Sequence, residues 1–357
     1  MRRWIKHILA VIAYYSGFLN IFIVLRRVLF PGSDLVILMY HRVIEDPDSS
    51  QEYTQSGIAV SNRSFDLQMA FLAKKYHVLR LDQLIKLLQN GRRLPRRCAV
   101  ITFDDGWRDN FLNAYPILQR HNLPATIFLS SDFIGTGRKF WFLQVGFLLA
   151  DGKLSAKDLV EILEKVLGDS SKTIPSGSGK SRDIGLISVD HNLFMEYLKQ
   201  FSRSTIKKII AEMICRSGLS HTEWPDREWT LTWEDIKQMS PEIVEFGSHG
   251  CSHNILTIME TDEIRRELME SKKLIEEKIQ KPVRSFAYPN GDYNAQIKEL
   301  VQKAGYDCAV TVIGCDAAET LHDRYALRRI NVNEGSTLSP AGRFSRSMFA
   351  CLLEGMF

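Results

Sequence analysis

The sequence predicts an α/β protein built around a parallel β-sheet, and three observations lead to this fold class. Short apolar runs rich in β-branched residues alternate with amphipathic stretches, as they do in β/α units. The chain has 357 residues, of which 45% are hydrophobic and 25% are charged, so it can bury the core of a globular protein. Polar residues that can carry chemistry directly follow several of the apolar runs, at the strand ends where the active sites of β/α folds collect.

Charge and cysteine content argue against two other classes of protein. Forty-six Lys and Arg residues against 42 Asp and Glu residues give a net charge of +4, which is too small for this length to indicate a nucleic-acid partner. The six cysteines include no C-x-x-C pair, so the sequence indicates neither a zinc ribbon nor a disulfide scaffold.

The first expected element is a hydrophobic helix within residues 1–33. Ile8 to Leu25 carries no charge, and a helix of this length rises about 27 Å, just under the roughly 30 Å core of a bilayer. Arginines and lysines flank this run on both sides, and no small-x-small cleavage site follows it. A membrane-spanning anchor is the favoured interpretation, while an interfacial helix and a helix buried in the protein stay open. The basic flanks leave the orientation undetermined.

Six apolar runs beyond this helix are predicted strands. They are Leu35–Tyr40, Cys98–Phe103, Ala125–Ser130, Ile243–Gly247, Ser285–Tyr288 and Cys308–Ile313. Helices with one apolar face separate them, including one that Asp82 is expected to cap and one from about Asp262 to Gln280. This alternation is what a parallel sheet covered by helices requires.

A helical insertion is expected at about 140–230, where the alternation stops. Two helical patterns occur there, one opened by Ser155 and closed by Gly168, and one with an apolar face from Ile206 to Met213. The Ser-, Gly- and Lys-rich stretch 170–182 between them is predicted to be a mobile loop. The residues leave open whether the insertion covers the mouth of the fold or packs toward a membrane.

Two adjacent carboxylates, Asp104 and Asp105, end the apolar run from Cys98 and precede Gly106. Side chains alternate along a strand, so this pair can converge only where the strand gives way to a turn. The pair is either catalytic machinery at a strand end or a turn with two solvated carboxylates.

Two histidines, His249 and His253, follow another apolar run. Histidines four residues apart can share one face of a helical turn and bind a metal together, although a single histidine is more often structural. With a carboxylate from another strand end they complete a two-His, one-carboxylate metal site. Cys251 lies between them, out of phase on such a turn, and is expected to be a bystander.

A third motif, Phe286-Ala287-Tyr288-Pro289-Asn290-Gly291, also follows a predicted strand. Its Pro and Gly favour a tight turn whose backbone N–H can point into a pocket and stabilise an oxyanion. By itself the motif indicates only a turn.

Together these elements resemble the polysaccharide deacetylase family, also called NodB-like or carbohydrate esterase family four. The segments that carry the resemblance are TFDDG at 102–106, GSHxxSH at 247–253 and FAYPxG at 286–291, in the order that the family has them. The resemblance covers roughly Leu35 to Glu334. It implies a distorted (β/α)7 barrel over 34–335, followed by a C-terminal tail or helix over 336–357, and metal-dependent hydrolysis of N-acetyl or O-acetyl groups on sugars.

The resemblance also implies roles for individual residues. Asp104 matches the catalytic base, whereas Asp105, His249 and His253 match the ligands of a divalent metal, usually Zn²⁺. A metal that polarises the acetyl carbonyl and lowers the pKa of water suits an acetamide, which is a poor electrophile. The backbone N–H of Asn290 is expected to stabilise the oxyanion.

Two departures from the family pattern matter. The third motif has Ala287 where the family commonly has an arginine, so another cation must orient Asp104; Arg329 is the candidate, unless it is an ordinary surface cation. The family's late leucine-histidine motif is missing, and His41 offers a replacement. That arrangement resembles the permuted poly-N-acetylglucosamine deacetylase branch, so His41 is expected to be the general acid rather than a structural histidine.

Aromatic rings within the motifs are candidates for sugar binding, because their faces stack on the apolar sides of pyranose rings. Trp107 and Tyr288 are the two expected to do so.

The sequence therefore predicts a membrane-associated deacetylase that acts on an N-acetylated bacterial polysaccharide or its lipid-linked precursor, at the cytoplasmic membrane. The bacterial setting comes from the resemblance alone. Two alternatives stay open: an O-acetyl esterase with the same site, and a catalytically silent glycan-binding barrel.

Overall fold

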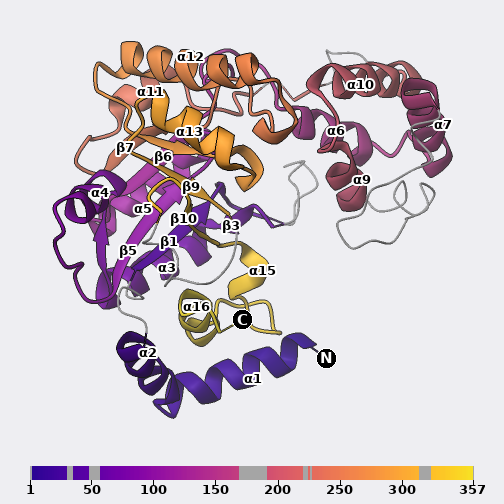
Figure 1. Cartoon of the computed structure of the whole chain (residues 1–357). Coiled ribbons are helices and arrows are strands. Elements are labelled where there is room, and N and C mark those ends of the chain that lie inside the picture. The colour runs from indigo at the N-terminus through magenta and orange to yellow at the C-terminus, as the bar shows by residue number, and fades with distance from the viewer. Residues whose placement is uncertain are drawn as a thin grey trace. The chain divides into compact units, whose positions relative to one another are not determined.

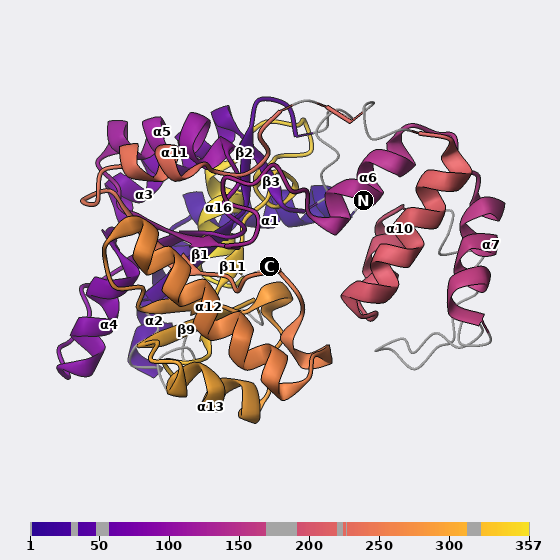
Figure 2. The ribbon, with the colours of Figure 1, turned by 90° about the horizontal axis from the view of Figure 1, so that it is seen from above.

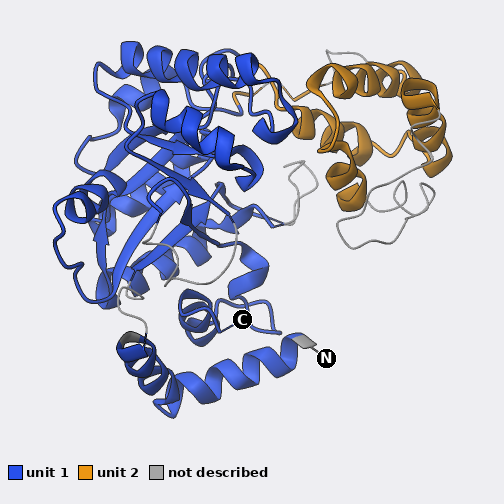
Figure 3. Ribbon diagram, in the orientation of Figure 1, with its two compact units in different colours: residues 1–47, 57–137, 229–357 blue, residues 48–56, 138–228 orange. Residues whose placement is uncertain are grey.

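The computed structural model describes residues 2–29, 35–47, 57–168, 191–219, 224–225, 227–312 and 323–356. The chain divides into two compact units, which Figure 3 shows in different colours. The first contains 1–47, 57–137 and 229–357, and the second contains 48–56 and 138–228. The predicted mobile loop at 170–182 lies outside the described residues.

A parallel barrel forms the centre of the first unit (Figure 1). Its strands are β1 (Leu35–Tyr40), β5 (Cys98–Phe103), β6 (Ala125–Leu129), β7 (Val244–Ser248), β8 (Ser285–Ala287), β9 (Cys308–Thr311), β10 (Leu327–Arg328) and β11 (Ile330–Asn331). They are ordered β10-β9-β8-β7-β6-β5-β1-β11, and β4 (His77–Leu79) pairs with β5 off this path. A separate two-stranded sheet joins β2 (Arg42–Ile44) to β3 (Ala59–Ser61). The predicted parallel β/α architecture is confirmed.

The barrel closes through one residue. β10 pairs with β9, β11 pairs with β1, and Arg329 alone separates β10 from β11. These two short strands are therefore halves of a single segment that joins both edges of the sheet. Seven segments complete the circuit in the described part of the chain, which confirms the seven-stranded barrel that the family resemblance implies.

Helices cover the outside of the barrel, as the view from above shows (Figure 2). They are α3 (Asn62–Lys75), α4 (Leu81–Gln89), α5 (Tyr115–His121), α11 (Trp233–Gln238), α12 (Thr261–Ile279), α13 (Ala295–Lys303), α15 (Glu334–Thr337) and α16 (Arg346–Leu353). The expectation that Asp82 caps α4 is wrong, because the helix begins two residues earlier than that cap requires and Arg80 is its N-cap. Asp82 lies in the first turn, where its carboxylate binds Arg80 and Lys86 instead.

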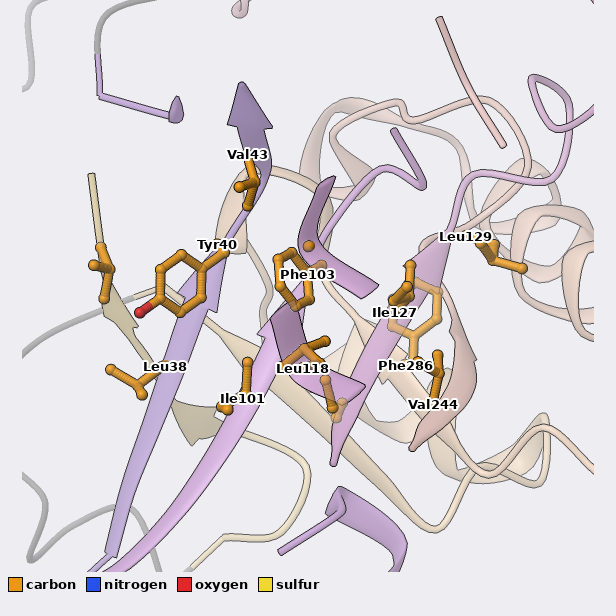
Figure 4. Close-up of a cluster of buried hydrophobic side chains, with 14 of the residues drawn as sticks. Leu38, Tyr40, Val43, Ile101, Phe103, Leu118, Ile127, Leu129, Val244 and Phe286 are labelled. Atoms are coloured by element: carbon orange, nitrogen blue, oxygen red, sulfur yellow. The ribbon is translucent and has the colours of Figure 1, made fainter. Parts of the chain in front are cut away.

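Strand alternation divides the apolar residues between two packed regions. Leu38, Tyr40 and Phe103 belong to the core between the strands and the helices (Figure 4). Leu35 and Val100 belong to a second cluster to which β1, β5, β6, β8, β9 and β10 all contribute, the pattern expected of a barrel interior. Alternate residues of a strand share a face. Thr102 and Asp104, at two and four positions after Val100, are therefore expected on the interior side of the barrel.

The second unit is helical in its described residues. Its helices are α6 (Trp141–Ala150), α7 (Ala156–Leu167), α9 (His191–Leu198) and α10 (Arg203–Ser217). Ser155 caps α7 by accepting a hydrogen bond from the backbone N–H of Asp158, as its sequence predicts. Sequence periodicity predicted only α7 and α10. It missed α6 because that helix is apolar on nearly all sides and shows no helical period.

The N-terminal segment forms two helices, α1 (Arg2–Tyr15) and α2 (Phe18–Leu29), so the prediction of one continuous helix is wrong. The chain breaks at Ser16-Gly17, where Gly17 has a φ of 82°, in the left-handed region that ends helices. The two axes differ by 80°. Among the described residues no single helix has the length and apolarity to cross a bilayer, and the two meet those criteria only as a bent pair.

Candidate active site

Most of the predicted site residues lie at the carboxyl ends of the barrel strands. His41 follows β1, Asp104 and Asp105 follow β5, and His249 follows β7. These are neighbouring positions on one rim of a parallel barrel, although the residues are far apart in the sequence.

A buried ion pair joins Asp104 to Arg329. The two guanidinium nitrogens of Arg329 donate to the two oxygens of Asp104, with Nη1–Oδ1 at 2.7 Å and Nη2–Oδ2 at 2.6 Å. Each residue is 2% exposed, which excludes the alternative that Arg329 is a surface cation. Arg329 also donates to Thr102 Oγ1 at 3.1 Å and to the carbonyl oxygen of Thr311 at 3.2 Å. These four acceptors fix the plane of the guanidinium and therefore the orientation of the Asp104 carboxylate.

The charge of Arg329 keeps Asp104 ionised. Burial raises the pKa of Asp104, but the positive charge of Arg329, together with His249, outweighs that effect and holds the pKa below its usual value. Asp104 is therefore a carboxylate at neutral pH, with the charge state that a proton acceptor needs.

Asp105, His249 and His253 form a second cluster beside this pair. Asp105 Oδ1 lies 3.5 Å from His249 Nε2 and 3.0 Å from His253 Nε2, and the ligand atoms of the three residues all lie within 4.8 Å of one another. The other carboxylate oxygen, Asp105 Oδ2, accepts a hydrogen bond from Trp107 Nε1 at 2.8 Å. His249 Nδ1 lies 2.8 Å from the carbonyl oxygen of Ala287. A carbonyl can only accept, so Nδ1 carries a proton, and in the neutral imidazole Nε2 presents its lone pair to the cluster.

Neighbouring charges keep the carboxylate of this cluster ionised. The pKa of Asp105 is held well below its usual value because the neighbouring histidines outweigh the effect of burial. Burial lowers the pKa of His249, but Asp104 and Asp105 raise it by more. A buried carboxylate and two imidazole nitrogens turned toward one point are the donor set that divalent transition metals bind, so the residues fit a metal site.

The loop between the histidines brings them together without a helical turn. Gly250 has a φ of 77° and His253 a φ of 56°, and the two imidazole rings lie 5.0 Å apart. A side chain at Gly250 would also meet Glu267 Oε2 at 2.8 Å from its Cβ. The predicted pairing of the histidines therefore occurs, but through a left-handed loop rather than a helix.

Glu267, from α12, holds this loop in place. Its carboxylate accepts hydrogen bonds from the backbone N–H of Cys251 at 2.6 Å and of Ser252 at 3.0 Å, and from the Ser252 hydroxyl. Cys251 points away from the metal cluster, because its thiol donates to the carbonyl oxygen of Glu267. Glu267 is not among the residues predicted from the sequence. Its signal was a charged residue on the apolar face of α12, between Ile264 and Leu268.

His41 is held at the site by residues that sequence reasoning also missed. Asn110 Nδ2 donates to the carbonyl oxygen of His41 at 2.8 Å. Asp109 accepts from the backbone N–H of Val43 at 3.0 Å and from Arg42 Nε at 2.9 Å. Asp109 is the N-cap and Asn110 the first residue of the short helix η2 (Asn110–Ala114), so the Asp109-Asn110 pair in the sequence was their only signal.

The environment of His41 favours its neutral form. Burial lowers the pKa of His41, and the opposing charges of Asp105 and Asp104 offset this only in part. His41 follows Tyr40, which pairs with Phe103 of β5, so it lies beside Asp104 at the barrel rim.

Two predicted sugar-binding residues are buried instead. Tyr288 has no exposed surface, and its hydroxyl donates to the carbonyl oxygen of Tyr325 at 2.9 Å. Trp107 is 1% exposed, with Arg42 over its ring at 4.6 Å. Both rings are core groups, which contradicts the expectation that they stack on substrate, and Trp107 supports Asp105.

Asn290 lies in the turn Pro289–Gly291, directly after β8. Its φ of 59° is left-handed, consistent with the tight turn predicted from its sequence. The contribution of its backbone N–H to an oxyanion site stays a prediction.

Comparisons with known proteins agree with this geometry. Residues 91–309 match the polysaccharide deacetylase family. A Bacillus subtilis protein called a putative polysaccharide deacetylase is 22% identical over 88% of this chain and 77% of its own length. The poly-β-1,6-N-acetyl-D-glucosamine N-deacetylase of Staphylococcus epidermidis is 30% identical over 40% of this chain, which spans about half of that relative (49%).

A solved structure shares the fold. IcaB from Ammonifex degensii superposes with a TM-score of 0.53 at 16% identity, over 90% of this chain and 97% of its own. The family match covers more than half of the chain and includes the Asp-Asp, double-histidine and Tyr-Pro segments that meet at the barrel rim. The chain therefore belongs to the polysaccharide deacetylase family and is a deacetylase enzyme.

Proposed function

We propose that this protein is a zinc-dependent N-deacetylase that acts on N-acetylglucosamine units of a bacterial polysaccharide or of its lipid-linked precursor. The observation that carries the proposal is the buried Asp104–Arg329 pair beside the Asp105, His249 and His253 cluster. The similarity to a poly-β-1,6-N-acetyl-D-glucosamine N-deacetylase supports the substrate class. The exposed apolar faces of α1 and α2 support a position at the cytoplasmic membrane.

Asp105, His249 and His253 would hold the metal, with Zn²⁺ suited to this set of one oxygen and two nitrogen ligands. When bound, the metal supplies a Lewis acid that polarises the acetyl carbonyl and lowers the pKa of water.

The protein's own residues move the protons in this mechanism. Asp104, kept ionised by Arg329, accepts a proton from the water that adds to the acetyl carbon. The backbone N–H of Asn290 donates to the carbonyl oxygen as negative charge develops there. His41 donates a proton to the sugar nitrogen as the carbon–nitrogen bond breaks, so the products are acetate and a free amine. The lowered pKa of His41 makes its imidazolium the stronger acid once it has taken up a proton.

Metal content and acetate release test the function directly. We expect about one metal per chain by elemental analysis, and release of acetate and free amine in equal amounts from N-acetylglucosamine oligomers. Chelation should stop both, and Zn²⁺ should restore them. Acetate without new amine would indicate an O-acetyl esterase, and a metal-free protein without activity would overturn the proposal.

Replacing His41 with alanine should lower the rate on N-acetylglucosamine oligomers by about 10²–10⁴-fold and leave the metal content unchanged. The same variant should hydrolyse 4-nitrophenyl acetate at nearly the wild-type rate, because nitrophenolate departs without a proton. Replacing the exposed His77 of β4 with alanine is the matched control and should change neither rate. Equal losses on both substrates would assign His41 a structural role.

A further inference from the structure

The outer faces of α1 and α2 expose an apolar surface that is unusual for this chain. On α1, six large hydrophobic side chains are between 52% and 74% exposed: Trp4, Ile5, Ile8, Leu9, Ile12 and Tyr15. Elsewhere on the described residues outside α1 and α2, only Leu112, Ile258 and Met269 are large, hydrophobic and exposed. The exposed residues of α1 recur at helical spacing, so they share one face of the helix.

The second helix continues this surface. Six residues of α2 are between 54% and 73% exposed: Phe18, Ile21, Val24, Leu25, Val28 and Leu29. Exposed apolar side chains in this number indicate an interaction site in a folded protein.

The inner faces of both helices are already covered by the barrel unit. Ala10 and Ala13 of α1 and Leu19 and Ile23 of α2 pack in one cluster with α16. Because both inner faces meet this cluster, both outer faces turn away from it, as the position of α1 and α2 beside α16 in Figure 1 illustrates.

A partly buried ion pair fixes the helices to the barrel unit. Arg26 donates to Glu354 Oε2 at 2.6 Å and to the Glu354 carbonyl oxygen at 2.8 Å. Tyr76 donates to Glu354 Oε1 at 2.9 Å, and Glu354 is 4% exposed. If α1 and α2 left the barrel unit to form one straight helix, Glu354 would lose its ion pair with Arg26. The apolar inner faces of both helices would also become exposed.

A basic groove lies next to α2. It has a volume of about 460 Å³, and its charged lining comes from Lys74, Lys75, Arg96 and Arg97. Arg97 also donates to Asn20 of α2 at 3.2 Å, which joins the groove to the apolar surface. An anionic membrane surface has phosphate groups above acyl chains. The cations of the groove suit the phosphates, and the exposed apolar helix faces suit the acyl chains.

We propose that this protein binds a bilayer containing anionic phospholipids from one side. The outer faces of α1 and α2 lie in the boundary between headgroups and acyl chains, the basic groove binds lipid phosphates, and both helices stay packed on α16. The helix pair is then an in-plane platform, not a membrane-spanning anchor. This inference is independent of the proposed deacetylation.

Sedimentation of the full-length protein with vesicles tests the lipid preference. The protein should pellet with vesicles of phosphatidylcholine and phosphatidylglycerol, and much less with phosphatidylcholine alone. Ile8→Glu with Val24→Glu should abolish binding to both, since each places a charge on the apolar surface. Ile258→Glu with Met269→Glu, which alters equally apolar exposed positions elsewhere on the barrel unit, is the matched control and should bind normally.

The groove has its own test. Lys74→Glu with Arg96→Glu should weaken binding to the anionic vesicles by about tenfold or more, with little change on neutral ones. Thermal melts should show all variants folded, because every altered side chain is exposed. Normal binding by the Ile8→Glu, Val24→Glu variant, or the loss of binding by the control variant, would overturn the proposal.

Accessibility of the first turn separates the in-plane platform from a spanning helix. In an Arg3→Cys, Cys215→Ser variant added to preformed vesicles, the new thiol should react with a membrane-impermeant maleimide. Cys215, which is exposed in the wild-type protein, reports the labelling expected outside the vesicle. Protection of the new thiol until detergent is added would show that the N-terminal helices cross the bilayer and would refute the platform.

Discussion

Replacing Asp104 with asparagine is expected to lower the rate of deacetylation by about 10²–10⁴-fold, since the amide cannot accept the proton of water. The new side chain would keep an oxygen toward Arg329 but would remove the only negative charge bound to that guanidinium in the described residues. Breaking a buried pair in this way costs about 3–5 kcal/mol, so the free energy of unfolding should fall as well. Metal content should be unchanged, because Asp105 and the two histidines are intact.

The rate must be measured on protein that urea titration shows to be folded. His253→Ala is the informative companion: it should lose metal and activity together, whereas Asp104→Asn should lose activity alone. If Asp104→Asn stays fully active on N-acetylglucosamine oligomers, the assignment of Asp104 as the base is wrong.

Replacing Arg329 with glutamine should have a large effect on stability. It leaves the Asp104 carboxylate buried without a cation, with an expected loss of about 3–5 kcal/mol in the free energy of unfolding. Arg324→Gln, an exposed position in the same segment, is the matched control and should change stability little. The double variant Asp104→Asn, Arg329→Gln should be more stable than the sum of the single losses predicts, because no unpaired charge remains.

The effect of Arg329→Gln should also depend on pH. The folded-state pKa of Asp104 is depressed by Arg329, so the pair stabilises the protein above the unfolded-state pKa of about 3.9 and stops doing so as the pH falls through the folded-state pKa. The stability difference between wild type and variant should therefore shrink in acid. In the variant the lowering effect of Arg329 is lost, while burial still raises the pKa of Asp104, so the acid limb of the rate profile should move to higher pH. An unmoved limb would contradict the coupling between these residues.

Strand periodicity made much of this site predictable. The apolar runs before Asp104 and His249 are strands, and their carboxyl ends meet because parallel strands share one rim. Asp104 follows Val100 and Thr102 on alternate positions, and Arg329 follows Leu327 in the same way, so both point into the barrel. The missing arginine at Ala287 indicated that a cation had to come from elsewhere in the chain.

Other features depend on contacts that local sequence does not encode. The ring of Tyr288 is buried because a carbonyl from a segment 37 residues away binds its hydroxyl, and no pattern around the motif reveals that partner. The bend after α1 depends on Gly17, which has a left-handed backbone conformation. Gly17 lies within an apolar run, and the hydrophobicity of that run does not show whether the helix continues or breaks there. Glu267 is a charged residue on the apolar face of α12, and its sequence position does not reveal what it binds. Only the fold brings its carboxylate to the loop of His249 and His253.

The single-residue junction at Arg329 has a consequence for the order of folding. Asp104 and its cation are separated by 225 residues, so during synthesis the carboxylate exists long before its partner emerges from the ribosome. A nascent chain that collapsed around β1 and β5 would bury an unpaired anion, at a cost of several kcal/mol. The charge thus disfavours early, incomplete barrels and delays compaction of the catalytic rim until the closing segment arrives. Contacts between residues this distant in sequence are slow to form, so closure of the barrel would be a late event in folding. The active site would be complete only at that point.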